Sequence, residues 1–240
     1  MLNGKTILIT GGARRIGRIM SLGVAKAGGN VLIHHNNSSK QAAELKNEIQ
    51  NIGQEADIIQ ADFSNPESSH KIFKEIFSSR TIFGLVHNAS IFDNLTWEDT
   101  QLNQWNQHFN INLTAPFFLS QLFSKSIPKT EKGRIVNILD WRALRPGADH
   151  FPYTISKAAL AALTKSMAVA LSPKITVNGI ALGAILPPSD GASTNNVLSD
   201  LQIPRWAESS EVEETLLFLL TGPEYITGEI IHLDGGRHLT

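Results

Sequence analysis

The chain has 240 residues, of which 42% are hydrophobic and 18% charged, a composition typical of one globular domain. A formal net charge of −1 gives no electrostatic indication of nucleic acid or an anionic membrane as partner, and no stretch approaches the ~18 uninterrupted apolar residues of a membrane-spanning helix. The sequence has no cysteine, which excludes disulfides and thiol catalysis, and it opens on a strand-like run rather than a signal peptide. We therefore expect residues 1–240 to form a single cytoplasmic domain that binds a small molecule, with neither nucleic acid nor membrane as partner.

Seven short runs rich in valine and isoleucine predict strands that are buried on both faces. They cover residues 6–10, 31–34, 56–59, 82–86, 134–138, 175–180 and 229–233. Helical patterns lie between them, among them residues 18–27, 41–51, 105–126, 153–171 and 211–220. This alternation predicts an α/β fold with a single doubly wound parallel sheet of Rossmann type, with seven strands and helices on both faces. The irregular stretch after the sixth strand predicts a substrate lid over about residues 183–208, because ligands bind at this edge of such sheets.

A glycine-rich turn, "ILITGGARRIGR", joins the first strand to the first helix. Glycines allow a tight turn there, and backbone N–H groups at a helix N-terminus can then bind a phosphate. The spacing is not G-x-G-x-x-G, so a plain turn is the alternative interpretation. The turn predicts a dinucleotide site that includes Gly11, Arg14, Ile16 and Gly17.

The end of the second strand, "VLIHHNNSS", lacks the acidic residue that holds the ribose 2′-hydroxyl in NAD-binding folds. In its place stand four potential hydrogen-bond donors, and Arg14 adds a positive charge from the glycine turn; the donors are His35, Asn36, Asn37 and Ser38. These residues predict NADP(H) rather than NAD(H), although a polar turn indifferent to the cofactor is the alternative. Asp62 closes the third strand, where its carboxylate could accept from the adenine amino group or cap a helix.

Further motifs follow in order: "HNAS" at 87–90, Asn112 in "NINLTAP", Tyr153 and Lys157 spaced Y-x-x-x-K, and the terminal "YITGEIIHLDGGRHL". With the glycine turn they resemble the short-chain dehydrogenase/reductase family over essentially the full chain. The resemblance implies that Tyr153 is the general acid, that Lys157 binds the nicotinamide ribose, and that Asn112 holds a water in a proton relay. It also implies a set of cofactor contacts: Asp62, Asn88, Ala89 and Gly183.

Apart from the resemblance, the spacing of Tyr153 and Lys157 has a direct physical consequence. Positions i and i+4 share one face of a helix, so Tyr153 and Lys157 can act on one ligand. The ordinary pKa of tyrosine is about 10, and a neighbouring ammonium stabilises the phenolate. We therefore expect Lys157 to lower the pKa of Tyr153; two unrelated residues on a helix surface are the alternative.

Three departures from the wider family resemble the pteridine reductases, including bacterial dihydromonapterin reductases. Arg15 replaces a glycine of the turn, "NAS" replaces "NAG" with Phe92 two residues after Ser90, and Asp140 stands thirteen residues before Tyr153, where serine is usual. In that subgroup the matching arginine contacts the cofactor phosphates and the pterin, the matching serine contacts cofactor and pterin, and the phenylalanine stacks on the pterin ring. The implied substrate residues are Arg15, Ser90, Phe92, Asp140 and Tyr153.

Asp140 fits a pterin because a carboxylate can accept from the N–H and amino donors of its ring, or hold a proton beside Tyr153 for a ring nitrogen. We therefore expect NADPH-dependent reduction of a pterin C=N bond, with Asn112, Asp140, Tyr153 and Lys157 as the catalytic residues. The alternatives are a carbonyl reductase acting on a ketone or 3-oxoacyl substrate, a catalytically silent NADPH-binding regulator, and an Asp140 that only caps a helix. The resemblance also implies a homotetramer, and the histidines show no metal-ligand spacing.

Overall fold

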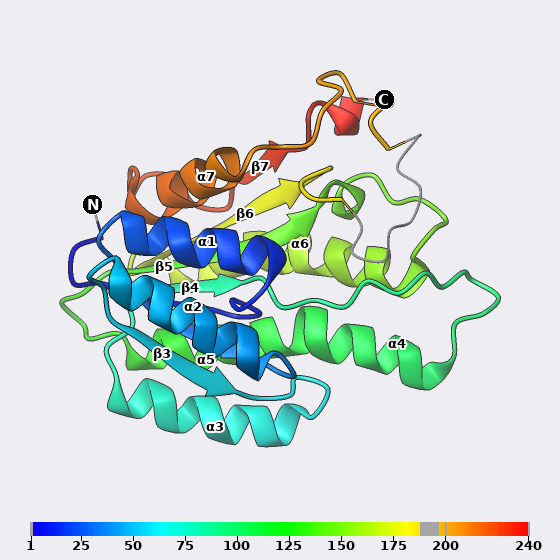
Figure 1. The fold of residues 1–240 in the computed structure, drawn as a ribbon. Helices are drawn as coiled ribbons and strands as arrows, with labels where there is room; N and C mark the ends of the chain where they lie inside the picture. The colour runs from blue at the N-terminus through cyan, green and yellow to red at the C-terminus, as the bar shows by residue number, and fades with distance from the viewer. Residues whose placement is uncertain (1, 188–196, 200, 240) are drawn as a thin grey trace.

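The computed structural model describes residues 2–187, 197–199 and 201–239. Within these residues seven parallel strands form one sheet in the order β3-β2-β1-β4-β5-β6-β7 (Figure 1). The strands are β1 Thr6–Ile9, β2 Asn30–His35, β3 Ala56–Gln60, β4 Gly84–His87, β5 Gly133–Asp140, β6 Ile175–Leu182 and β7 Ile230–Leu233. The predicted α/β sheet of Rossmann type is confirmed, and each predicted strand overlaps an observed one.

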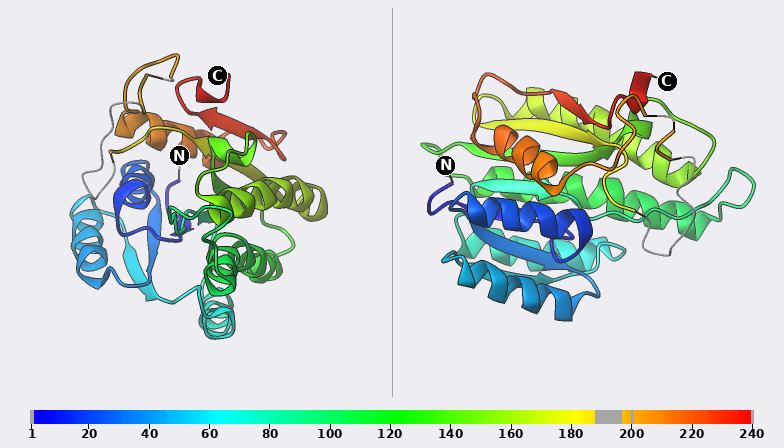
Figure 2. Two further views of the ribbon diagram at one scale, coloured as in Figure 1. Left: turned by 90° about the vertical axis from the view of Figure 1, so that its right-hand side faces the viewer. Right: turned by 45° about the horizontal axis from the view of Figure 1, so that its top comes forward.

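Helices cover both faces of the sheet, as the end-on view in the left panel of Figure 2 shows. They are α1 Arg15–Lys26, α2 Ser39–Asn51, α3 Pro66–Ser79, α4 Leu102–Phe109, α5 Ala115–Ser126, α6 Phe151–Leu171 and α7 Ser209–Thr221. Strand side chains alternate between the two faces. Ile7 and Ile9 pack in the core cluster that contains α1, α2 and α7, whereas Leu8 packs with α3 and α5. Burial on both faces explains why the strands read as continuous apolar runs.

The helix predicted over residues 105–126 is interrupted. It consists of α4, a π-helical turn over Asn110–Thr114, and α5. Pro116 has no N–H to donate to the carbonyl of Asn112 four residues earlier, and its ring would clash with that carbonyl in a regular helix. The amide of Ala115 instead donates to the carbonyl of Asn110. The wider turn places Asn112 inside the protein, where it is fully buried.

Helix α3 was not among the predicted helices. Its start is encoded locally, because the side chain of Asn65 accepts from the amide of Ser68 at 3.1 Å and proline stands at the first helical position. By length and mean hydropathy, α6 could cross a membrane. In this fold it packs against β5 and β6, and it buries Tyr153 and Lys157. Its apolar residues therefore include side chains of the core, such as Leu160 and Ala161.

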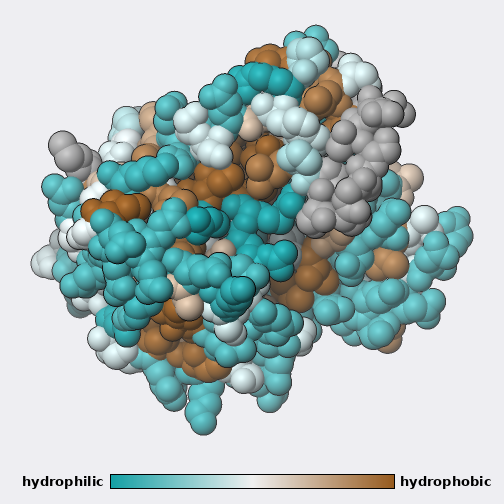
Figure 3. All heavy atoms as spheres, viewed as in Figure 1, coloured by the Kyte–Doolittle hydropathy of each residue, from teal (hydrophilic) through white to brown (hydrophobic). Residues whose placement is uncertain are grey.

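Strand β1 lies between β2 and β4. The sheet extends from β1 to β2 and β3 on one side and to β4, β5, β6 and β7 on the other, so the strand order reverses at β1. Ligands of open α/β sheets bind beyond the carboxyl ends of the strands at such a switch point. Figure 3 shows the side of the molecule on which α1 and α2 lie, where hydrophilic and hydrophobic residues are mixed. The glycine turn after β1 and the "HNAS" segment after β4 meet at this point.

Candidate active site

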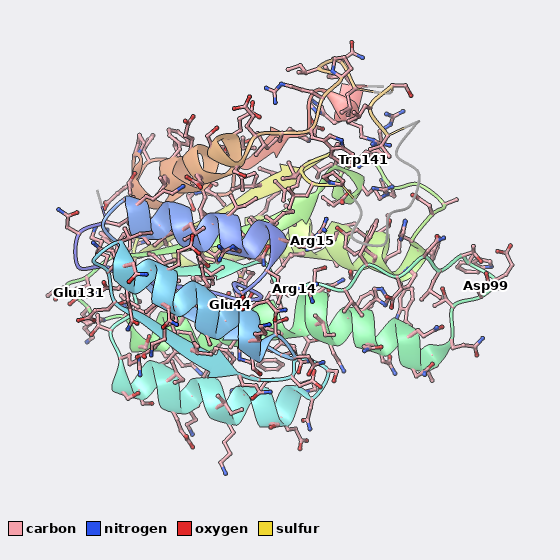
Figure 4. The ribbon with its side chains drawn as sticks, viewed as in Figure 1. Arg14, Arg15, Glu44, Asp99, Glu131 and Trp141 are labelled. Atoms are coloured by element: carbon pink, nitrogen blue, oxygen red, sulfur yellow. The ribbon has the colours of Figure 1, made fainter. Side chains whose placement is uncertain are left out.

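A cleft of about 470 Å³ lies at the carboxyl ends of β1 and β4. It brings together eleven of the residues predicted from the sequence: Gly11, Arg14, Arg15, Ile16, Gly17, Asn36, Asp62, Asn88, Ala89, Ser90 and Phe92. Figure 4 shows Arg14 and Arg15 at the end of α1 that faces this edge. Asp62 is the only carboxylate among the described residues that line the cleft.

The glycine turn allows a ligand to approach the backbone closely. Gly11 has a φ of +61°, and a Cβ on Gly17 would lie 2.0 Å from the carbonyl oxygen of Gly11, so no side chain fits there. Asn88 donates from Nδ2 to the carbonyls of Thr10 and Gly11 at 2.9 and 3.0 Å, which fixes the turn to the end of β4. The N-cap residue of α1, Arg14, makes no capping bond with its side chain, and the first turn of the helix contains no acidic residue. Among the described residues, the N–H groups at this helix end are therefore available to an anion.

Arg15 occupies the place where the family resemblance expects glycine, and its backbone has the matching conformation. Its φ is +49°, which costs a non-glycine residue roughly 1–2 kcal/mol. Its guanidinium donates from Nη2 to the carbonyl of Pro187 at 2.8 Å. This contact places the first residues after β6 beside the cleft. Residues 188–196 and 200 of the predicted lid lie outside the described residues.

His34, which the sequence interpretation did not select, lines the cleft. Its Nδ1 accepts from the amide of Gly11 at 3.1 Å, so its Nε2 carries the proton and donates to the carbonyl of Ala61 at 3.1 Å. Phe63 stacks on the ring with centroids 4.3 Å apart. Burial lowers the pKa of His34 to about 4, so the ring is neutral near pH 7. His34 therefore connects the glycine turn to the end of β3.

Several predicted cofactor residues do not line this cleft: His35, Asn37, Ser38, Lys157 and Gly183. His35 alternates with His34 along β2 and is buried, with Nδ1 3.1 Å from the carbonyl of Asn36. Ser38 precedes α2 as its N-cap residue. A Cβ on Gly183 would lie 2.6 Å from Cα of Asp234, so close packing after β7 accounts for glycine at that position.

Tyr153 and Asp140 meet where the first turn of α6 crosses the end of β5. The hydroxyl of Tyr153 donates to Oδ2 of Asp140 at 3.0 Å. The other oxygen, Oδ1, accepts from the amide of Arg142 at 2.9 Å and caps a short 3₁₀ turn over Trp141–Ala143. The helix-capping alternative for Asp140 therefore describes one of its oxygens, while the second oxygen binds the phenol.

The expected effect of Lys157 on Tyr153 is wrong in this structure. Burial raises the pKa of Tyr153 well above its ordinary 10.0, and Asp140 raises it further, while Arg142 opposes the rise. Lys157 Nζ lies 5.8 Å from the centre of the tyrosine ring and donates to the carbonyl of Ile138 at 2.7 Å. Burial lowers the pKa of Lys157 to about 8. Burial and then the directly bonded carboxylate of Asp140 hold Tyr153 as a neutral phenol.

Asn112 connects the cleft to α6. Its Oδ1 accepts from Ser90 Oγ at 3.0 Å and from the amide of Ile91 at 3.1 Å, and its Nδ2 donates to Ser156 Oγ at 3.0 Å. Ser156 donates in turn to the carbonyl of Tyr153 at 2.7 Å. Through its side chain, Asn112 fixes the segment after β4 to the start of α6, where Tyr153 lies.

Aromatic rings form one wall beside the phenol. Phe92 contacts the ring of Tyr153 edge to face, with centroids 4.6 Å apart. One face of Phe92 stacks on His150 at 3.8 Å, and 51% of the residue is exposed. His150 has a φ of +47°, and its Nδ1 lies 3.0 Å from the carbonyl of Asp93. The described residues therefore place a half-exposed aromatic ring next to the Tyr153–Asp140 pair.

Arg142 is a second residue that the sequence interpretation missed. Its Nη1 lies 3.6 Å from Oδ1 of Asp140, and its Nη2 donates to Oδ2 of Asp149 at 2.6 Å. The guanidinium lies over the ring of Trp141 at 4.7 Å, and Arg237 lies 4.6 Å from the same ring. Figure 4 labels Trp141 at this end of the sheet. The available sequence signal was its position two residues after Asp140.

Comparisons with known proteins agree on the family and differ on the substrate. Residues 5–197 match the model of the short chain dehydrogenase family. A 3-oxoacyl-[acyl-carrier-protein] reductase from Synechocystis is 30% identical, with 98% of this chain and 97% of the relative aligned. A 2-dehydro-3-deoxy-D-gluconate 5-dehydrogenase from Bacillus subtilis is 32% identical, with 98% and 95% aligned.

Among solved structures, FolM alternative dihydrofolate reductase 1 from Brucella canis, complexed with NADP, is 35% identical to this chain with a TM-score of 0.87. The match covers 98% of this chain and 95% of that one. The family match includes the glycine turn, Asn112, Tyr153 and Lys157. The chain belongs to the short-chain dehydrogenase family.

Proposed function

We propose that this protein is an NADPH-dependent reductase that acts on a C=N bond of a pterin, with Tyr153 as the proton donor. The observation that carries the proposal is the hydrogen bond from the hydroxyl of Tyr153 to Oδ2 of Asp140. A carboxylate at this point accepts from the ring N–H and amino groups that a pterin presents and a ketone lacks. The likeness to an alternative dihydrofolate reductase supports the same substrate class.

The cleft fits NADP(H). Its glycine turn leaves no space for side chains, and the uncapped start of α1 offers N–H groups to a pyrophosphate. The described lining contains no carboxylate at the end of β2, where Asn36 and Arg14 can donate to a 2′-phosphate. When bound, this cofactor supplies the hydride. The Brucella canis neighbour, solved with NADP, supports the assignment.

The side chains of this protein supply the proton for the reduction. Burial and Asp140 keep Tyr153 in its phenol form, so Oη holds a transferable proton near pH 7. In the reduction, the substrate carbon receives the hydride and the ring nitrogen receives the proton from Oη, which leaves a phenolate that solvent reprotonates. Asp140 orients the phenol through Oδ2 and accepts from the substrate. Phe92, half-exposed beside Tyr153, provides a face for the ring.

A homotetramer, which the family resemblance implies, is part of the proposal. Apolar side chains on α5 and α6 are exposed in the single chain: Phe117 at 43%, Phe118 at 39% and Val169 at 82%. Exposed apolar surface on long helices favours burial against a second copy.

A second candidate is a carbonyl reductase acting on a ketone or 3-oxoacyl substrate. The 30% identity to a 3-oxoacyl-[acyl-carrier-protein] reductase over nearly the whole chain favours it. The experiment that separates the two is NADPH oxidation against dihydrobiopterin, dihydromonapterin, dihydrofolate, a small ketone and an acetoacetyl thioester. The pterin proposal expects turnover of at least one pterin with kcat/KM well above that of any carbonyl compound. The reverse order would favour the carbonyl reductase, and NADPH binding without any turnover would favour the silent regulator.

A further inference from the structure

Groups other than the phenol of Tyr153 also contact the carboxylate of Asp140. Its carboxylate has Tyr153 on one oxygen, the amide of Arg142 on the other, and the Arg142 guanidinium 3.6 Å away. The side chain of Arg142 is only 14% exposed, so solvent screens its charge weakly. A guanidinium remains charged at every accessible pH. Asp140 is therefore paired with a fixed cation on the side away from Tyr153.

Arg142 is itself anchored. Nη2 and Nε donate to Oδ2 of Asp149 at 2.6 and 3.2 Å, an arrangement that fixes the plane of the guanidinium. Trp141 lies against one face of that plane, and the centre of the Phe92 ring lies 5.7 Å from Cζ of Arg142. With these contacts made, Arg142 has little capacity left to bind a substrate anion.

We infer that Arg142 is a positioning residue of this site: anchored by Asp149 and Trp141, it holds the carboxylate of Asp140 in place against the hydroxyl of Tyr153. The inference rests on the proposed function only in treating Tyr153 as the proton donor. It concerns the free protein and needs no particular substrate.

The charges around the phenol explain why a cation is needed. Asp140 bonds to it from β5, and Arg142 pairs with Asp140 from the 3₁₀ turn. Lys157 lies on α6, with Nζ 5.8 Å from the centre of the Tyr153 ring. From the chain before α6, Asp149 pairs with Arg142 and His150 stacks on Phe92. Without Arg142, the carboxylate of Asp140 would lose the guanidinium that lies 3.6 Å from its Oδ1. The charge of Asp140 would then lose the cation that opposes it, and it would disfavour the phenolate of Tyr153 more strongly.

Arg142 and Asp140 act on the phenol with opposite signs. The charge of Arg142 lowers the pKa of Tyr153, and the charge of Asp140 raises it. Neutralising Arg142 must therefore move the titration of Tyr153 to higher pH, whereas neutralising Asp140 must move it to lower pH. A purely structural side chain would produce no such pair of opposite shifts.

The chain allows this to be measured directly, because it contains two tyrosines and Tyr225 is fully exposed. In a Tyr225→Phe background, the near-ultraviolet absorbance of phenolate reports on Tyr153 alone. We expect Arg142→Gln to raise the midpoint by ~1 pH unit and Asp140→Asn to lower it by a similar amount. Arg142→Lys should fall between parent and glutamine variant, because lysine keeps the charge and loses the bidentate anchor. The control Arg80→Gln removes an exposed arginine that pairs with Asp57, and should leave the midpoint unchanged.

An Arg142→Gln midpoint equal to the parent value, or a shift of equal size in the control, would overturn the inference. If the glutamine variant fails to fold, the lysine variant decides, since a midpoint identical to the parent would also overturn it. The titration uses no substrate, so its result is independent of the pterin assay. The inference can hold when no pterin is reduced, and it can fail when a pterin is reduced. As a second readout, Arg142→Gln should shift the alkaline limb of the kcat/KM profile upward for whichever substrate is reduced.

Discussion

Tyr153 donates from Oη to Oδ2 of Asp140 across 3.0 Å, a phenol bonded to a carboxylate where the wider family places a hydroxyl. The two groups come from different elements, β5 and the first turn of α6, which pack directly against each other. The bond keeps the proton on the phenol, because Asp140 raises the pKa of Tyr153 on top of the effect of burial. Tyr153 is therefore a neutral phenol near pH 7.

Replacing Asp140 tests both the role of the carboxylate and the substrate class. Asp140→Asn keeps the shape and removes the charge, so pterin turnover should fall by ~10²–10⁴-fold in kcat while the Kd for NADPH stays the same. Asp140→Ser restores the hydroxyl that is usual in the family; it should lose pterin reduction, whereas a carbonyl reductase would keep or gain ketone reduction. Steady-state kinetics and cofactor fluorescence titration provide the measurements. Full pterin turnover by both variants would remove Asp140 from the mechanism.

Acid should destabilise the protein through His34. Its pKa is about 4 in the folded protein against an ordinary 6.5, because burial disfavours the charged ring. The unfolded chain therefore binds this proton first, so the stabilising contribution is complete above pH ~6.5 and is lost as the pH falls toward 4. Between pH 7 and pH 5 the loss in unfolding free energy assigned to His34 is about 2 kcal/mol.

Urea unfolding of a His34→Asn variant at pH 7 and pH 5 measures that contribution. The variant should lose less stability than the parent between the two pH values, whatever its stability at pH 7. His70→Asn is a suitable control, because His70 lies on α3 at an edge-on contact with Phe118, away from the cleft. An identical pH dependence in the parent and in His34→Asn would contradict the assignment.

Arg14 should govern the choice of cofactor. Its side chain is exposed at the mouth of the glycine turn, and no described carboxylate at the end of β2 competes with it for a 2′-phosphate. A lost charge-assisted bond is typically equivalent to ~1.5–3 kcal/mol, so Arg14→Ala should lower kcat/KM for NADPH by ~10–100-fold and barely affect NADH. Parent kinetics should favour NADPH. Equal or better use of NADH by the parent would refute the preference.

Phe92 should contribute to pterin binding. Its ring is held by stacking on His150 and by an edge contact with Tyr153, so little ordering is needed when a substrate arrives. Aromatic stacking contributes roughly 0.5–1.5 kcal/mol beyond area burial, and Phe92→Ala should raise the KM for pterin several-fold or more. Phe92→Tyr retains the ring and serves as the matched variant. An unchanged KM in Phe92→Ala would remove the main support for a stacked substrate.

The state of assembly is directly measurable. Light scattering at micromolar concentration should give the mass of four chains. Phe117→Asp together with Phe118→Asp should dissociate the assembly, because a charge on an apolar interface is left without a partner. A monomeric parent would refute the tetramer.

Much of this protein follows from local sequence pattern. Alternation of apolar strands with helical repeats determined the sheet, because strands buried on both faces must be apolar along their whole length. The glycine turn and the Tyr153–Lys157 spacing are equally local: one requires positions without side chains, and the other requires two residues on one helix face. These patterns also locate the cleft, since strand ends of a parallel sheet share one edge.

Other features were decided by tertiary packing. Whether His34 or His35 faces the cleft depends on the pleat of β2 in the finished sheet, and one residue of register exchanges the two. Pro116 reshapes the helix around Asn112, which a continuous helical pattern does not reveal. The protonation of Tyr153 depends on burial, on Asp140 at 3.0 Å and on the anchored Arg142, while Lys157 lies farther away. Charge interactions depend on distance and on exclusion of water, and only the packing of α6 against β5 sets both.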